Sequence, residues 1–322
     1  MKKILFASSA IVAVAFAGQA SASEPIKLSV GGYMEQWIGF ADEDAPGGAG
    51  RVNAFQSDTE VYFDGRTTLD NGIEIGAHIE LEGESSSGDQ VDEQFLFVNG
   101  GFGRIEIGKN DSAADSMAVS APRVGPVGPN DGGIEDWYNE AGIIDTAPSS
   151  GDQNRATYYT PSLGGFQAGV SFADDSGQND ASGDGDNIVS AAIAYDADFD
   201  GFSLGLSVEG ENQDEDDWYG AGVNVGFGNF TVGGSYGHVE PETGDEVDAF
   251  DLGVSYAMDA ASVSATYAYQ EEGDEELQAA SVGLNYTLGA GVSWQSSVFW
   301  FDEESAADNE GYGVVTGIAL NF

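Results

Sequence analysis

The final eleven residues of the chain alternate strictly between apolar residues and small or polar ones. A period of two is typical of a β-strand, because successive side chains point to opposite faces. The pattern therefore predicts a strand that meets an apolar environment on one face and a crowded or watery interior on the other. The apolar face holds Tyr312, Val314, Ile318, Leu320 and Phe322, and the other face holds Gly313, Gly317 and Asn321.

The opposite end of the chain has the features of a cleaved signal peptide. Two lysines precede an apolar stretch over residues 4–17, and the small residues at 20–22 suit signal peptidase. The stretch is shorter than the roughly 20 apolar residues that span a bilayer. We therefore expect residues 1–22 to direct export through the Sec pathway and to be removed, which leaves 23–322 as a single domain.

The chain is extremely acidic, with 56 Asp and Glu against 9 Lys and Arg and a net charge of -47. Without the two lysines of the signal peptide, seven bases oppose the same 56 acids and the net charge becomes -49. The segment after Arg155 holds 31 of the acids and no Lys or Arg. Nucleic acid is excluded as a partner, because binding to it depends on basic side chains. We expect such an acidic surface to attract cations.

The sequence downstream of residue 22 contains no candidate transmembrane helix and no cysteine. A role within a membrane then requires a closed β-barrel, the other structure that satisfies every backbone group in lipid. Segments of about 9 to 11 residues with alternating apolar side chains, the length that crosses a bilayer when tilted, run through the chain. Examples are 219–227 and 292–300, where Tyr, Phe and Trp gather near the strand ends as in an aromatic girdle.

The connections between these segments alternate between short turns and long acidic stretches. Residues 70–72 predict a tight turn, whereas 211–217, 240–246 and 271–276 predict acidic loops at the opposite end. Together with a long segment over 110–154, the connections predict sixteen strands. The expected fold class is all-β: a transmembrane antiparallel β-barrel.

Several segments, taken in order, resemble the sixteen-stranded general porins of Gram-negative outer membranes, and the first strands are similar to the alphaproteobacterial branch. They are 27–32 (KLSVGG), 101–108 (GFGRIEIG), 155–166 (RATYYTPSLGGF) and the terminal Phe322. The resemblance implies an outer-membrane homotrimer for passive diffusion of small hydrophilic solutes and ions, with no cofactor required. It also implies that the barrel-assembly machinery reads the C-terminal strand, and that the third loop folds into each pore.

The third loop is expected over residues 110–154, a length that is usually functional for a connection without regular structure. Apolar residues are expected to anchor it to the inner wall: Ile134, Trp137, Tyr138, Ile143 and Ile144. Carboxylates are expected to form the acidic side of a constriction: Asp131, Glu135, Asp136, Glu140 and Asp145. An acidic exterior loop is the alternative.

Charged residues of the wall are expected to face this loop. Alternation with lipid-facing Val61 and Ile105 places Glu60, Asp64, Arg66, Arg104 and Glu106 inside, and the resemblance adds Arg155. Opposed charges create a transverse field in a pore. Glu60 and Gln94 stand where the family pattern would place two further arginines, which favours cation selectivity.

Catalysis is not expected, because the histidines His78 and His238 lack a flanking nucleophile motif. Residues 180–185 carry oxygen-bearing side chains at alternate positions, as the calcium loop of an EF-hand does. The twelfth position of such a loop is normally a Glu that binds the ion, but here it is Ala191, so an EF-hand is not expected. Ca²⁺ or other divalent cations at clustered surface carboxylates, bridging to outer-membrane lipid and lipopolysaccharide, remain plausible by charge.

Two other functions stay open: a substrate-specific channel and a structural or adhesive barrel with a plugged lumen. The inward aromatics Tyr33, Tyr62 and Phe299 are too scattered for a sugar track. Small inward residues such as Ser207 and Ser235 favour open space over a plug.

Overall fold

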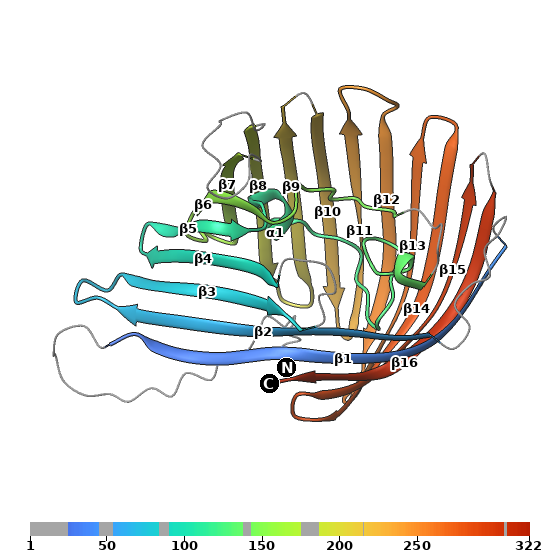
Figure 1. The fold of residues 1–322 in the computed structure, drawn as a ribbon, viewed down its shortest axis with the longest axis horizontal. Coiled ribbons are helices and arrows are strands. Elements are labelled where there is room, and N and C mark those ends of the chain that lie inside the picture. The colour runs from blue at the N-terminus through green and yellow to red at the C-terminus, as the bar shows by residue number, and fades with distance from the viewer. Residues whose placement is uncertain are drawn as a thin grey trace.

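A computed structural model of the chain describes residues 25–44, 54–83, 90–137, 143–174, 187–214, 216–305 and 308–322. The predicted signal peptide therefore lies outside the described residues. Within them the chain forms sixteen antiparallel strands in one closed barrel (Figure 1). This confirms the predicted fold class.

The strands follow one another around the barrel in chain order, and each pairs with its neighbours in sequence. Their bounds are β1 (Lys27–Glu43), β2 (Ala54–Thr68), β3 (Glu74–Glu82), β4 (Val91–Gly100), β5 (Gly103–Asn110), β6 (Gln153–Tyr159), β7 (Phe166–Asp174), β8 (Asn187–Asp198), β9 (Ser203–Gln213), β10 (Asp216–Phe227), β11 (Phe230–Glu240), β12 (Val247–Ala257), β13 (Ala261–Glu272), β14 (Glu275–Gly289), β15 (Val292–Glu304) and β16 (Asn309–Asn321). Two short helices, α1 (Ala113–Met117) and η1 (Glu135–Trp137), lie between β5 and β6.

The barrel closes between its first and last strands. Tyr33 of β1 lies opposite Asn321 of β16, and the ladder continues to Glu43 opposite Gly311. The backbone of Phe322 adds two hydrogen bonds with Gly32, at N to O distances of 3.0 and 3.1 Å. The described strands therefore leave no unpaired sheet edge, which is the condition for a sheet to lie in hydrocarbon.

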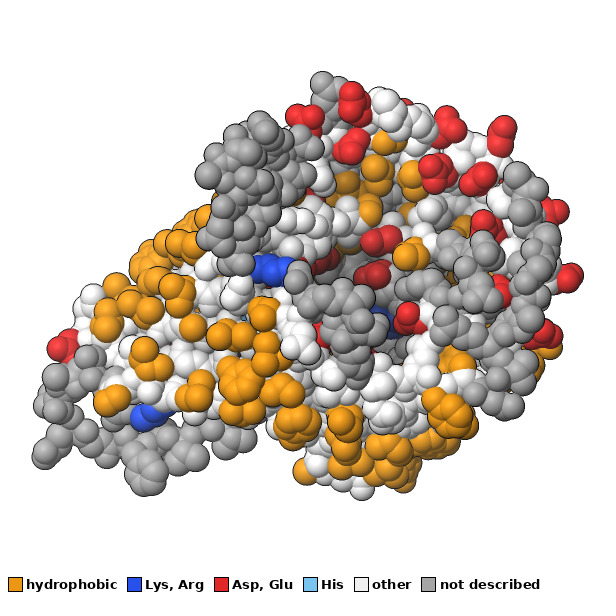
Figure 2. All heavy atoms as spheres, viewed as in Figure 1, with side chains coloured by type: hydrophobic (Ala, Val, Ile, Leu, Met, Phe, Trp, Pro, Cys, Tyr) orange, Lys and Arg blue, Asp and Glu red, His pale blue; other side chains and the backbone are white. Residues whose placement is uncertain are grey.

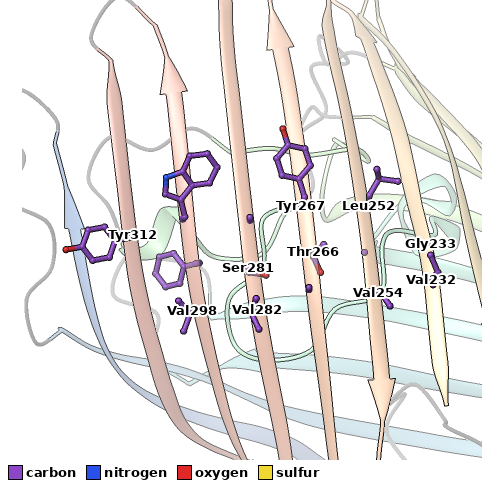
Figure 3. Close-up of a pocket in the computed structure, with 15 residues that line it drawn as sticks. Val232, Gly233, Leu252, Val254, Thr266, Tyr267, Ser281, Val282, Val298 and Tyr312 are labelled. Atoms are coloured by element: carbon purple, nitrogen blue, oxygen red, sulfur yellow. The ribbon is translucent and has the colours of Figure 1, made fainter.

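The alternation in the last strand separates its two faces as predicted. Val314 and Ile318 are exposed on the outside, whereas Val315 and Ala319 are buried inside the barrel. The outer face is apolar around the molecule, and an orange band of such side chains covers the flank in Figure 2. On β11–β16 this face has a shallow hollow of about 730 Å³, where Val254 and Val282 lie below the larger Tyr267 (Figure 3).

Short turns gather at one end of the barrel and the longer connections at the other. Leu69 and Ile73 close the predicted turn between β2 and β3, and Gly72 there adopts a φ of 82° that suits glycine. At the other end, acidic side chains stand around the rim (Figure 2).

Two of the predicted acidic loops are wrong, because the strands continue through them. β9 and β10 reach Gln213 and Asp216, and β13 and β14 reach Glu272 and Glu275. Backbone ladder hydrogen bonds do not depend on side-chain polarity, so Glu271 pairs across from Glu276 and Glu272 from Glu275. Like charges thereby face each other across the strands, an arrangement that is unfavourable unless cations neutralise it.

None of the helices in the described part of the chain is long and apolar enough to cross a membrane.

Candidate functional site

The segment between β5 and β6 turns into the barrel and follows its inner wall. In Figure 1, α1 and the chain after it lie inside the curve of β7–β16. The part of the segment before η1, which we call the first pass, contacts the wall from β7 to β15. η1 then contacts β1. The part after η1, which we call the return pass, contacts β13 and β11 before the chain enters β6. The inserted arrangement is therefore the one that the structure shows. We call this segment, residues 111–152, the pore loop.

Wall hydroxyl groups bind the first pass of the pore loop. Each serine oxygen accepts a backbone N–H, which satisfies polar groups that are shielded from water. The pairs are Ala113 with Ser171 at 3.0 Å, Val119 with Ser207 at 2.9 Å, Val124 with Ser264 at 2.9 Å, and Val127 with Ser297 at 3.1 Å.

Glycines in the wall make room for the pore loop. A Cβ atom on Gly222 would lie 1.7 Å from the carbonyl oxygen of Val119, and one on Gly283 would lie 1.6 Å from that of Val124. The small inward residues were interpreted above as open space. In this arc of the wall that interpretation is wrong, because Gly222, Gly283 and the serines seat the pore loop.

Asp251 of β12 joins both passes of the pore loop to the wall. Its side chain is only 1% exposed. Oδ2 accepts the Ala121 N–H at 2.9 Å and the Asn130 side-chain amide at 2.6 Å. Oδ1 accepts the N–H of Ser235 at 2.5 Å and its hydroxyl at 2.7 Å. The hydroxyls of Ser235 and Thr146, on the return pass, lie 2.7 Å apart.

Apolar side chains fix the far end of the pore loop. Ile134, Trp137 and Ile144 are buried in a cluster with wall residues that include Phe299 and Phe301. These three predicted anchors are buried as expected. Ile143, by contrast, is 50% exposed, because the chain turns its neighbour Ile144 toward the wall instead. The fifth anchor, Tyr138, lies outside the described residues.

The predicted loop carboxylates occupy different positions. Asp131 and Asp136 are exposed, and Asp131 has a φ of 39°. Asp145 is half-buried and accepts the Ala147 N–H at 2.7 Å. The backbone of Glu135 forms part of η1. Glu140 lies outside the described residues.

The pore loop follows the wall from β6 round to β1 and also contacts the start of β2, where the Gln56 side-chain amide donates to the Asp136 carbonyl. The rest of β2 and β3–β5 form the opposite side of the lumen. Strand register places Glu60 beside Tyr33, Asp64 beside His78, and Glu106 beside Phe97, all on the inner face. Arg66 and Arg104 share that face. Gln94 pairs with Ile79, which is exposed outside, so this expected wall position points outward.

Arg155 lies on the inner wall but does not face open lumen. It is 3% exposed. Its guanidinium donates to the Ser150 hydroxyl at 3.1 Å and to the Gly151 carbonyl, and it lies 3.9 Å from the Glu211 carboxylate. The end of the pore loop folds over it, so Arg155 fastens that end rather than opposing the loop carboxylates.

Sequence reasoning missed Arg123, the one basic residue of the pore loop. It is exposed, packs along Gly128 and Gly132, and donates to the Asp131 carbonyl at 3.3 Å. Its position within a long acidic segment was the signal that could have identified it.

Among the residues that the structure describes, three groups of inner side chains bring potential metal ligands within 4.8 Å of one another. They are His78 with Glu80 and Glu93, Glu60 with Glu82 and Asp92, and Glu93 with Asp111 and Asp152. Both ring nitrogens of His78 already lie against carboxylates, at 2.8 and 2.5 Å. His78 therefore offers no free ligand atom in this arrangement.

Carboxylates crowd together where the pore loop leaves and rejoins the wall. Burial raises the pKa of Asp115 to about 7, and the neighbouring Asp111 carboxylate adds to the effect. Burial, followed by the carboxylates of Asp111 and Asp92, raises the pKa of Asp152 to about 7. Burial also raises the pKa of Asp111. Part of this cluster therefore holds protons near neutral pH.

A closed barrel with an apolar outside, a polar inside and a long loop folded into its lumen defines a membrane-spanning β-barrel channel. Residues 7–305 match the family model for Gram-negative porins. The chain belongs to the Gram-negative porin family. This membership places it in the outer membrane and confirms that it is a channel protein rather than an enzyme.

Relatives and solved structures agree with this family. Outer membrane porin protein 32 of Delftia acidovorans is 28% identical over 223 residues, which cover 64% of this chain and 60% of that protein. The porin of Rhodobacter capsulatus is 28% identical over 155 residues, covering 48% of this chain and 49% of that one. The matches thus span about half to three fifths of these relatives. The anion-selective porin from Comamonas acidovorans superposes with a TM-score of 0.68 at 16% identity, over 92% of this chain and all of that one.

Proposed function

We propose that the chain forms a water-filled channel for passive diffusion of small hydrophilic solutes and ions, and that the channel prefers cations. The observation that carries this proposal is the lumen between the pore loop and β2–β5. Exposed Asp131 and Asp136 stand on the pore loop, and the carboxylates of Glu60, Asp64 and Glu80 line the inner wall of β2 and β3.

The charge of the lumen favours potassium over chloride. Arg155 is covered, and Arg104 is paired with Glu106 of its own strand, with Nε 2.5 Å from Oε1. Two further basic groups count against this preference: Arg66 on this wall and exposed Arg123 on the pore loop. The carboxylates of the wall outnumber these two; they are Asp58, Glu60, Asp64, Glu80 and Glu93. Their field acts over about 8 to 10 Å at physiological salt, which is comparable to the radius of a pore mouth. The porin from Comamonas acidovorans is anion-selective, but at 16% identity the likeness to it concerns the fold alone.

The test is a planar-bilayer recording of the purified protein in a KCl gradient. We expect a zero-current potential on the cation-selective side. The double substitution Asp131→Asn and Asp136→Asn should move it toward the value of an unselective channel, because two exposed charges leave the lumen. Asp259→Asn, in an exposed turn at the opposite end of the barrel, is the matched control. Wild-type preference for chloride would refute the proposal, and an unchanged potential in the double variant would place those carboxylates outside the ion path.

We further propose that the protein works as a homotrimer that contacts lipid and lipopolysaccharide through divalent cations. The outer faces of the early strands carry strongly exposed apolar residues, among them Leu28, Leu96 and Ile107. Like-charged pairs such as Glu271 and Glu276 at the acidic rim support bound divalent cations. Recognition of the strand ending in Phe322 by the barrel-assembly machinery belongs to the same proposal.

A further inference from the structure

Four ring side chains form a continuous row across the inner face of β1–β4. Tyr33, Tyr62, His78 and Phe95 come from four neighbouring strands, and their successive ring centroids lie 6.2, 5.8 and 5.2 Å apart. These distances are typical of interacting aromatic pairs. The earlier interpretation of the inward aromatics as scattered is therefore wrong for Tyr33 and Tyr62, which the strand register brings together.

Carboxylates border the row. The Tyr33 hydroxyl shares its one proton between Asp58 at 3.0 Å and Glu60 at 2.9 Å, and the Tyr62 hydroxyl donates to Glu60 at 2.7 Å. These bonds hold the two phenol rings beside negative charge. The tyrosines therefore have a π face for a ligand, while their hydroxyl protons are already used.

The row already holds one planar cation. Nδ1 of His78 lies 2.8 Å from Asp64, and Nε2 lies 2.5 Å from Glu80. Two carboxylates beside one imidazole favour its positively charged form, in which both ring nitrogens donate. This ring lies between Tyr62 and Phe95.

A second planar cation lies at the end of the same wall. The Arg104 guanidinium carbon is 4.2 Å from the centroid of the Phe97 ring, and Nε lies 2.5 Å from Glu106. Gly76 makes the site possible, because a Cβ there would meet the Phe97 ring at 2.4 Å. His78 and Arg104 thus share one arrangement, in which a planar cation contacts both an aromatic ring and a carboxylate.

We propose that the β1–β5 wall is a track that binds planar organic cations, guanidinium compounds above all, as they pass through the channel. The inference deepens the proposed channel function and rests on it. The rings are only partly covered, and they belong to the arc of the wall opposite most of the pore loop. A guanidinium group stacks on an aromatic face while it binds carboxylates, as Arg104 does within the chain.

Neutral sugars fit the same wall less well. A sugar needs both donors and acceptors around its hydroxyl groups, whereas the Tyr33 and Tyr62 hydroxyls already donate to carboxylates. Anionic solutes would meet the charges of Asp58, Glu60, Asp64 and Glu80 directly. A cationic solute is therefore the class that matches both the rings and the carboxylates.

The test compares two peptides of equal charge, triarginine and trilysine, in single-channel recordings of the wild-type protein. A guanidinium group stacks flat on a ring while its fork binds a carboxylate, whereas an ammonium group meets the same site as a point charge. Triarginine should therefore reside longer than trilysine, by about two- to fivefold when the difference amounts to one exposed cation–π contact. The double substitution Tyr33→Leu and Tyr62→Leu should reduce this ratio toward one. The control Tyr312→Leu, on the outer face, should keep the wild-type ratio.

Equal residence times for the two peptides in wild-type protein would overturn the track while leaving the channel intact. So would a ratio that survives the double substitution. In contrast, a protein that conducts no ions, or that prefers chloride, would refute the proposed channel function itself. The two failures are therefore distinguishable in one experiment.

Discussion

Asp251 shows how a single side chain can set the shape of a lumen. Buried on β12, it accepts hydrogen bonds from Ala121 and Asn130 of the pore loop and from Ser235 of the neighbouring strand. A buried carboxylate is favourable only when its oxygens are satisfied in this way. The position of the pore loop therefore depends on a wall residue that touches no solute.

Asp251→Ala should loosen the pore loop and destabilise the barrel. Each buried donor left without an acceptor costs about 1–3 kcal/mol. We expect a lower unfolding temperature and a noisier single-channel current, since the first and return passes lose their common attachment. Asp259→Ala, at an exposed turn, should change neither property. A quiet, wild-type current from Asp251→Ala would show that the remaining serine contacts hold the pore loop by themselves.

At the scale of elements, the two ends of the pore loop form a proton-binding cluster. The pKa values of Asp115 and Asp152 lie near 7 in the folded chain, against 3.8 for an ordinary Asp. The folded state therefore binds more protons than the unfolded state between these values. The cluster contributes stability that is fully present below the ordinary value and is lost as pH rises through about 7.

The unfolding temperature should consequently be higher at about pH 5 than at about pH 8 in detergent. Asp152→Asn should weaken this dependence, because the amide carries no charge to lose or gain. Asp259→Asn should leave the dependence as in wild type. A steeper pH dependence in Asp152→Asn would contradict the role given to the cluster.

Sequence periodicity was sufficient for the strands, because apolar alternation such as that of β16 is a local signal. The insertion of the pore loop was implied by the family resemblance, and apolar residues such as Trp137 supported it. Periodicity was not sufficient for Arg155 or the serine contacts. Their roles depend on which wall segment the return pass covers, and that is fixed by tertiary packing. The ring row was missed for a related reason: Tyr62 and His78 meet only through the register between β2 and β3.

At the scale of the whole molecule, the outer face of the early strands is the surface proposed for trimer contact. Leu96 lies on that face. Phe95 and Phe97 of the same strand pack within the inner wall and add nothing to this surface. The case for trimer contact therefore rests on the outer residues alone.

In mild detergent the protein should run as a trimer that dissociates on heating, and chelation of divalent cations should lower the unfolding temperature. The physical reason for the second effect is repulsion between paired carboxylates such as Glu272 and Glu275 when no cation lies between them. Mass measurement under non-denaturing conditions checks the trimer, and thermal unfolding with and without chelator checks the role of cations. A monomeric mass would refute the trimer, and an unchanged unfolding temperature would refute stabilisation by divalent cations.

The pairing of β1 with β16 also determines the timing of assembly. Neighbouring strands can form hairpins within microseconds, because their partners are close in sequence. Tyr33, by contrast, pairs with Asn321, which lies near the other end of the described residues. Contacts of such high sequence separation form slowly. Until β1 pairs with β16, the backbone groups at the edge of β1 are unpaired and can bind other strands. The barrel is therefore most prone to aggregation between export and closure.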